Sequence, residues 1–363
     1  MDQNQIWIAY GNEPGASTDQ LLRRIDLIRW IRPGAKIGLK PNLVVASRAS
    51  SGATTHPEIA EAIIVYLQEH GFHDLTILEG SWLGEDTERA FRNCGFEDLA
   101  RRYRVRLVDL KRDAAVKKRV DDLELSICRT ALETDFLINL PVLKAHCQTA
   151  LTCALKNLKG CIPDSEKRRY HGMGLHRPIA ALAAALRPSL TIADAICGDL
   201  TFEEGGNPVR MDRIIAGTDP VLLDTYAANL IGLDPDAVPY IGLASRLGAG
   251  SMDLSQAVFE EINPDQKPLL SGTPSGKARS LGRNVEERQA CSACYGSLIH
   301  ALHRLSADHS LAKLPPLKIG QGFKGTTGSG LGIGSCTHKL EVNLPGCPPT
   351  ARDITVFLER HLK

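Results

Sequence analysis

The stretch KIGLKPNLVVASRASSGATTHPEIAEAIIVYLQEHGFHDLTILEGS, residues 36–81, decides the fold class. It contains two short apolar runs, at 36–40 and 75–78, on either side of an amphipathic pattern at 57–69. Pro57 follows His56 at the expected helix start, where a proline is well tolerated because the first N–H groups of a helix have no partner inside it. A strand, a helix and a second strand in this order predict a βαβ unit with parallel strands.

The same alternation continues over most of the chain. Further strands are expected at 6–10, 105–110, 135–140, 190–193 and 213–216, and further helices at 17–30, 86–92, 148–158, 178–186, 220–231 and 235–247. We therefore expect an α/β fold, with a mostly parallel sheet and helices on both faces. Ligands of such sheets bind beyond the carboxyl ends of the strands, so functional residues are expected in the loops that follow strands.

The composition predicts a soluble globular protein. Of the 363 residues, 43% are hydrophobic and 23% are charged, which is enough apolar material for a core. Because 43 Lys and Arg balance 42 Asp and Glu, there is no overall basic field for nucleic acid or an anionic membrane. The sequence also contains neither a secretion leader nor an apolar run long enough to span a membrane. We expect a cytoplasmic protein with no nucleic-acid or membrane partner.

The amino-acid composition of the chain changes near residue 262. The following stretch, NPDQKPLLSGTPSGKARSLGRN, is rich in Pro, Gly, Ser and basic residues and has little periodicity. We predict an α/β core domain over 1–262 and a cysteine-rich domain over 263–363. In the second domain, helices are expected at 292–305 and 351–362 and strands at 316–319 and 331–333, which makes it a small α+β segment.

Four of the ten cysteines lie in this last segment, at Cys291, Cys294, Cys336 and Cys347. In a cytosolic chain, cysteines are more often thiols or metal ligands than disulfides. Cys291 and Cys294 form a CxxC pair at an expected helix start, and the compact Gly and Pro residues beside Cys336 and Cys347 let backbone amides approach sulfide. The pattern predicts one [4Fe–4S] cluster; structural zinc and unligated thiols are the alternatives. Two roles of the cluster are left open, redox activity and stabilisation of the small domain. The binding of a second metal or a flavin is also left open.

A second group of candidate residues lies in NLPVLKAHCQTALTCALKNLKG, residues 139–160. Lys144 and His146 follow an expected strand near a helix start, where a lysine and helix N–H groups together favour an anion. We predict that Lys144, Lys156 and Lys159 neutralise a small anionic ligand or cofactor and that His146 transfers protons. Alternatively, Lys156 and Lys159 form only the basic end of a helix. The neighbouring Cys147 is interpreted as a small buried hydrophobe.

Further polar candidates follow other strands. Lys40 and Asn42, in KPN, offer a cation and an amide at the same edge of the sheet. Asp194 ends LTIAD and Asp224 lies one turn into the helix that Pro220 opens, and we expect each to orient a cation, with Asp194 as a candidate base. His171, in SEKRRYHGMGLH, is a candidate proton carrier if this charged stretch closes over a ligand; the alternative is a solvated loop.

These motifs together resemble the domain-of-unknown-function family 362. The resemblance covers roughly residues 5–250 and is carried by KPNLV, THPEIAEAIIVYLQEHGF, LEGS, the KxH…LKNLKG segment, LTIADAICG and IIAGTDPVLLD. It implies an α/β core in an anaerobic redox context, with [4Fe–4S] domains as frequent partners, and no defined reaction. In contrast to members with a two-cluster ferredoxin tail, this chain has four spread cysteines, so at most one cluster is expected.

Three functions are compatible with these features. The leading hypothesis is an iron–sulfur oxidoreductase or electron-transfer enzyme that acts on a small anionic substrate or cofactor in the α/β core. The second is a non-redox isomerase or lyase with a structural cluster. The third is a non-catalytic electron carrier or cofactor-maturation protein that docks a redox partner through the basic segment 262–284 and the cluster face. The oligomeric state is left open, a homodimer included.

Overall fold

The computed structural model describes residues 4–269, 276–308 and 311–362. The chain forms two compact units: unit 1 comprises Met1–Glu166 and His176–Pro274, and unit 2 comprises Lys167–Leu175 and Ser275–Lys363. The sequence did not indicate that residues 167–175 belong with the C-terminal unit. The predicted basic segment 262–284 includes residues 270–275, which lie outside the described residues.

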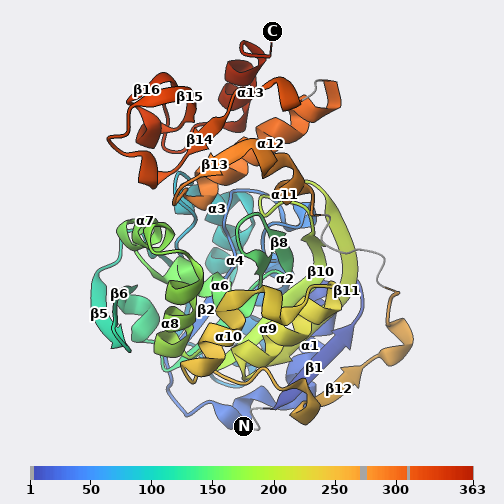
Figure 1. Ribbon diagram of the computed structural model, residues 1–363. Helices are drawn as coiled ribbons and strands as arrows, with labels where there is room; N and C mark the ends of the chain where they lie inside the picture. Colours follow the sequence, from blue (N-terminus) through green and yellow to red (C-terminus); the bar gives the residue numbers. More distant parts are fainter. Residues whose placement is uncertain (1–3, 270–275, 309–310, 363) are drawn as a thin grey trace. The chain divides into compact units, whose positions relative to one another are not determined.

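An eight-stranded sheet forms the centre of unit 1 (Figure 1). Its order is β12-β1-β11-β10-β7-β2-β3-β4. The strands are β1 (Gln5–Tyr10), β2 (Ile37–Pro41), β3 (Leu75–Glu79), β4 (Arg106–Asp109), β7 (Phe136–Leu140), β10 (Leu190–Asp199), β11 (Pro208–Gly217) and β12 (Val258–Ile262). Of these strands, β11 alone pairs antiparallel, with β1 and β10, so the predicted mostly parallel sheet is confirmed. Strands β10 and β11 each continue for ten residues, well beyond the predicted 190–193 and 213–216.

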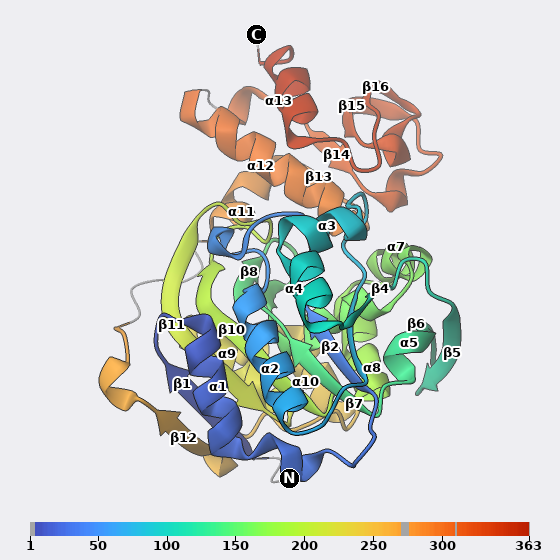
Figure 2. The same ribbon diagram turned by 180° about the vertical axis from the view of Figure 1, so that it is seen from behind.

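Helices cover both faces of this sheet, as the alternation predicts. One group is seen from behind in Figure 2: α1 (Pro14–Ile25), α2 (Pro57–Glu69), α3 (Thr87–Asn93) and α4 (Phe96–Tyr103). The other faces the viewer in Figure 1: α6 (Ala154–Asn157), α8 (His176–Leu186), α9 (Pro220–Leu230) and α10 (Pro239–Arg246). Helix α2 shows why they bind the sheet, because its apolar positions Ile59, Ile63 and Leu67 are fully buried. Two smaller elements flank the sheet, the hairpin β5 (Ala115–Val120) and β6 (Leu123–Cys128), and α5 (Arg129–Leu132).

The helix predicted over 148–158 is wrong in its first half. Strands β8 (Lys144–His146) and β9 (Ala150–Thr152) form an antiparallel hairpin there, and the helix α6 begins only at Ala154. The N–H groups of Gln148 and Thr149 donate to His146 Nδ1 at 3.0 and 3.2 Å, and Ala150 adopts a left-handed φ of 65°. These side-chain bonds to the turn offer the backbone an alternative to a helix, which apolar spacing alone does not reveal.

Unit 2 contains a four-stranded parallel sheet and three helices, as expected for a small α+β segment. The sheet order is β13-β14-β15-β16, with β13 (Val285–Glu287), β14 (Leu317–Ile319), β15 (Gly328–Ile333) and β16 (Leu340–Leu344). The helices are α11 (Lys277–Leu281), α12 (Ser292–Asp308) and α13 (Ala351–Glu359), and the last part of α7 (Asp164–Gly172) also belongs to this unit. The buried residues Leu298, Leu302, Ile354 and Leu358 place apolar surface of both α12 and α13 in the interior. In the described part of the chain, no helix has the length and apolar character needed to cross a membrane.

Candidate functional site

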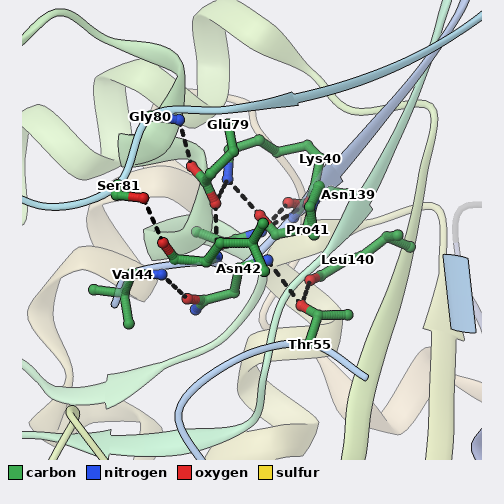
Figure 3. A network of polar contacts seen from close by, with 12 residues as sticks. Lys40, Pro41, Asn42, Val44, Thr55, Glu79, Gly80, Ser81, Asn139 and Leu140 are labelled. Atoms are coloured by element: carbon green, nitrogen blue, oxygen red, sulfur yellow. Dashed lines mark hydrogen bonds and ion pairs between the residues drawn. The ribbon is translucent and has the colours of Figure 1, made fainter. Parts of the chain in front are cut away.

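Lys40 and Asn42 lie at the carboxyl end of β2, Lys144 and His146 follow β7, and Asp194 lies within β10. The chain leaves β2 toward β3 and β4 on one side of the sheet, whereas β7 and β10 lie on the other side. Such a change of direction usually opens a crevice for a ligand. Here Thr55 connects the ends of β2 and β7. Its Oγ1 accepts the N–H of Asn42 at 2.8 Å and donates to the carbonyl of Leu140 at 2.7 Å (Figure 3).

Lys40 and Glu79 form a buried ion pair at this edge (Figure 3). The Lys40 ammonium donates to Glu79 Oε2 at 2.9 Å and to the Pro41 carbonyl at 2.7 Å, and the two side chains are 0% and 3% exposed. The backbone of Gly160 approaches this pair so closely that a Cβ there would overlap both side chains. The Lys40 ammonium therefore already donates hydrogen bonds to acceptors within the protein. Its contact with a cofactor stays a prediction.

Asn42 and Asp224 also make local contacts. Asn42 Oδ1 accepts the N–H of Val44 at 3.3 Å within the loop after β2. The Asp224 carboxylate accepts the N–H groups of Ala154 and Leu155, at 2.6 and 3.1 Å, and so caps the start of α6. Burial raises the pKa of Asp224 to about 7. These contacts explain why both residues are placed as they are, and their binding of a cofactor stays a prediction.

Three predicted residues, Lys144, His146 and Lys156, converge on Glu203, which the sequence analysis did not single out. His146 Nε2 is paired with Glu203 Oε2, and Lys156 Nζ lies 3.5 Å from the same oxygen. Lys144 Nζ donates to the backbone carbonyls of Glu203 and Ala53, at 2.8 and 2.6 Å. Burial alone would raise the pKa of Glu203, but His146 and Lys156 hold it below its ordinary range. A buried carboxylate thus occupies the predicted anion environment.

The two nitrogens of His146 have different roles in this cluster. Its Nδ1 accepts backbone N–H groups of Gln148 and Thr149, so Nδ1 carries a lone pair. Burial lowers the pKa of His146 to about 4, so the ring is neutral near pH 7. The single ring proton of the neutral imidazole is therefore on Nε2 and points at Glu203. The cluster presents this N–H and the Lys156 ammonium to one carboxylate group.

The His146, Cys147 and Glu203 ligand atoms lie within 4.8 Å of one another, a spacing that also suits a metal ion. Three features oppose that interpretation. Metal-bound histidines normally donate with the second ring nitrogen, whereas here that nitrogen accepts. The Lys156 ammonium lies 3.5 Å from the Glu203 carboxylate and would repel a cation. Burial also raises the pKa of Cys147 well above 9.0, which disfavours the thiolate that a metal requires. The cluster is better suited to an anion.

The electrostatics of this cluster involve Lys144 and extend to one further lysine, Lys159. Burial lowers the pKa of Lys144 to about 8, even though Glu203 opposes the shift. Lys159, half-buried in the turn Leu158–Cys161, is among the charges that lower the pKa of His146. The predicted set of Lys144, His146, Lys156 and Lys159 is therefore brought together in unit 1.

Asp194 contacts His56 in the structure, and its predicted role in orienting a cation stays a prediction. Its carboxylate is fully buried on β10 and accepts the backbone N–H of His56 and that of Ile196, at 2.8 and 3.1 Å. The same oxygen that binds the His56 backbone also lies 2.8 Å from His56 Nδ1. Burial by itself lowers the pKa of His56, but the bond to Asp194, with a contribution from Cys197, raises it to about 10. The sequence analysis treated His56 only as the residue before Pro57.

In unit 2, the four predicted cluster ligands lie in one region. Burial raises the pKa of the Cys294 thiol well above its ordinary value, and Cys291, Cys347 and Cys336 raise it further. The backbone before Cys336 also faces Cys294, because a Cβ built on Gly334 would lie 3.9 Å from Cys294 Sγ. The turns that carry Cys336 and Cys347 are joined by a hydrogen bond of 2.8 Å from the Ser335 N–H to the Gly346 carbonyl.

Polar groups from the segment 167–175 lie beside these cysteines. Gln321 Nε2 is 3.8 Å from Cys291 Sγ and also donates to the carbonyl of Arg168 at 2.9 Å. His171 Nε2 lies 3.4 Å from both the N–H and the hydroxyl of Ser292, between Cys291 and Cys294 in the sequence. His171 belongs to unit 2 and Lys144 to unit 1, so their predicted cooperation stays a prediction.

Comparisons with known proteins agree with the sequence motifs. The family model described as a domain of unknown function (DUF362) matches residues 37–229. A thylakoid-associated protein of Synechocystis is 30% identical over 235 residues, which cover 60% of this chain and 70% of that protein. A crystal structure of a Thermotoga maritima protein matches at 14% identity with a TM-score of 0.39, over 65% of this chain and 60% of that chain.

Proposed function

This chain belongs to the DUF362 family, and from that premise we propose that it is an iron–sulfur redox enzyme. Unit 2 would hold one [4Fe–4S] cluster through Cys291, Cys294, Cys336 and Cys347. Unit 1 would bind a small anionic substrate or cofactor at the cluster of Lys144, His146, Lys156, Lys159 and Glu203. When bound, an iron–sulfur cluster supplies one electron at a time.

The observation that carries the proposal is the gathering of four thiols around Cys294. Cysteines are the usual ligands of [4Fe–4S] clusters. The same four thiols could instead bind one tetrahedral zinc ion, and metal analysis distinguishes the two centres.

The anion site of unit 1 has the groups that a reduction requires. Adding electrons to a substrate adds negative charge, which the ammonium groups of Lys144 and Lys156 would stabilise. His146 Nε2–H would donate a proton or hydrogen bond to the atom that gains charge. The ligand would take the place next to these donors that the Glu203 carboxylate now has, so a carboxylate or similar small oxyanion is the expected class.

Anaerobic purification followed by iron and sulfide analysis tests the cluster. We expect about four irons and four sulfides per chain, and an EPR signal after one-electron reduction by dithionite. The Cys294→Ser variant should lose the cluster, whereas the matched control Cys94→Ser, a buried cysteine of unit 1, should retain it. Stoichiometric zinc, or iron retained at full level by Cys294→Ser, would overturn the proposal.

Thermal stabilisation by small carboxylates tests the anion site. In the wild type, oxalate, acetate and phosphate are suitable probes, and binding should raise the melting temperature of unit 1. Lys144→Ala should abolish that shift and leave the cluster spectrum intact. A probe that stabilises Lys144→Ala as much as the wild type would remove Lys144 from the site.

A non-redox proton-transfer reaction is the second candidate. It is favoured by the position of Lys144, buried next to Glu203 with a pKa lowered to about 8, close to the range in which a lysine serves as a base. A variant without the cluster, such as Cys294→Ser, would retain full turnover under this candidate and would lose it under the redox proposal.

A further inference from the structure

The His56–Asp194 pair includes a third group that the anion site does not use. Cys197 lies three residues after Asp194 on β10, and in a regular strand the two side chains would point to opposite faces. The pairing with β11 shifts between Ala195 and Cys197, and Asp194 Oδ1 accepts the N–H of Ile196, a bond that a regular strand does not make. Such irregularities re-aim side chains, and here His56 contacts both Asp194 and Cys197.

The three side chains are connected in a defined order. His56 Nδ1 faces Asp194 at 2.8 Å, and the Cys197 thiol is the second side-chain partner of this imidazole. The Cys197 thiol also donates to the carbonyl of Ala49, in the short helix Ala49–Ser51, at 3.5 Å. Asp194 is fully buried, whereas the His56 side chain is 14% exposed and Cys197 is 7% exposed. The orienting carboxylate is thus closed off, the thiol is largely buried, and the imidazole is partly exposed.

We propose that Cys197, His56 and Asp194 form a second reactive site, in which the Cys197 thiol is a nucleophile toward a small activated acyl group, an ester or a thioester. The arrangement of a thiol, an imidazole and a carboxylate performs acyl transfer in unrelated folds, where the carboxylate fixes the ring and the ring holds the proton of the nucleophile. Nothing in the redox proposal requires this site, so the two stand or fall separately.

The reaction needs no oxidant or reductant. His56 holds the thiol proton while Cys197 Sγ forms a bond to the acyl carbon, and the bond from that carbon to the leaving oxygen or sulfur breaks. His56 then gives the proton to the leaving group, which departs as an alcohol or a thiol. The product is an acyl thioester on Cys197. Cys197 and His56 are the catalytic residues, and Asp194 is a positioning residue because it acts through His56.

The acyl probe p-nitrophenyl acetate tests this site in anaerobically purified, full-length protein. We expect a burst of one p-nitrophenolate per chain, with the acetyl group located on Cys197 by peptide mass spectrometry. Cys197→Ser should abolish this labelling, and His56→Gln should slow it about 100-fold. Cys94→Ser is the matched control, because Cys94 is buried near the same loop and donates to the Ser47 carbonyl at 3.1 Å, and it should leave the burst unchanged.

Two further measurements separate a reactive site from a structural one. Asp194→Asn should shift the pH profile of the burst rate, which a purely structural role would not do, and an acetyl thioester of a small thiol should give the same adduct with release of that thiol. A burst retained by Cys197→Ser, or acetylation spread over several cysteines at similar rates, would overturn the proposal. An unchanged rate in folded His56→Gln protein, checked by its melting temperature, would do the same.

Discussion

Units 1 and 2 both gather reactive side chains, but they stabilise them in opposite ways. In unit 1, the carboxylates of Glu79 and Glu203 are each matched by buried lysines. In unit 2, like groups meet, because Cys291, Cys336 and Cys347 each raise the pKa of the Cys294 thiol and so make its ionisation less favourable. Opposite charges stabilise each other without a ligand, whereas four thiolates require a positive centre between them. We therefore expect the site of unit 1 to be formed by folding alone and that of unit 2 to depend on metal.

Removal of the proposed cluster should have the largest effect on stability, because unit 2 is the unit expected to depend on metal. Chelation of iron, or Cys294→Ser, is expected to destabilise unit 2 by on the order of 10 kcal/mol, by analogy with structural metal sites. Hydrogen exchange should show loss of protection in α12 and β15, with β2 and β10 unchanged. Equal protection in both units before and after chelation would mean that unit 2 folds without metal.

Removal of one partner of the buried Lys40–Glu79 pair should have the next largest effect on stability. Lys40→Met leaves the Glu79 carboxylate buried without its cation, and we expect the free energy of unfolding to fall by about 3–5 kcal/mol. The double variant Lys40→Met/Glu79→Leu should recover most of this loss, because neither charge remains. Urea unfolding of the three variants measures it, and a double variant no more stable than Lys40→Met would contradict the ion-pair explanation.

The variant Glu203→Gln tests how much the opposite charges of unit 1 stabilise each other. The amide retains an acceptor for His146 but removes the negative charge beside Lys156, so we expect a loss of about 2 kcal/mol in the free energy of unfolding. Because Glu203 raises the pKa of Lys144 against the effect of burial, the variant should also lower that pKa below about 8. NMR titration of labelled lysines measures the shift. The neighbouring Glu204→Gln is the control and should have the smaller effect.

The pH dependence of the His56–Asp194 pair should be the smallest effect. The pKa of His56 is raised from 6.5 to about 10 in the folded state, so its contribution is fully present below pH 6.5 and is lost as the pH rises through 10. The wild type should therefore be more stable than His56→Gln near pH 6, and this difference should shrink toward pH 10. A difference that grows with pH would show that His56 is not protonated in the fold.

Much of the architecture could be predicted because its signals are local. The helix predicted at 57–69 is α2 (Pro57–Glu69), and the strand predicted at 75–78 is β3 (Leu75–Glu79). A run of apolar residues with flanking turns requires only the information in one short window. The hairpin β8–β9 escaped prediction because its turn depends on the hydrogen bonds to the His146 side chain and on the left-handed φ of Ala150, which apolar spacing does not report.

The α/β class and the DUF362 family could be inferred from the sequence alone. The sequence also predicted the four C-terminal cysteines as one ligand set and the lysines and histidine of an anion site, and these stay predictions. Only the tertiary structure decided which carboxylate these cations meet and which histidine Asp194 binds. Lys40 and Glu79 are 39 residues apart, and His56 and Asp194 are 138 apart. Periodicity reports the face on which a side chain lies, but the partner of a buried polar group depends on which strands and loops the fold brings to one edge of the sheet.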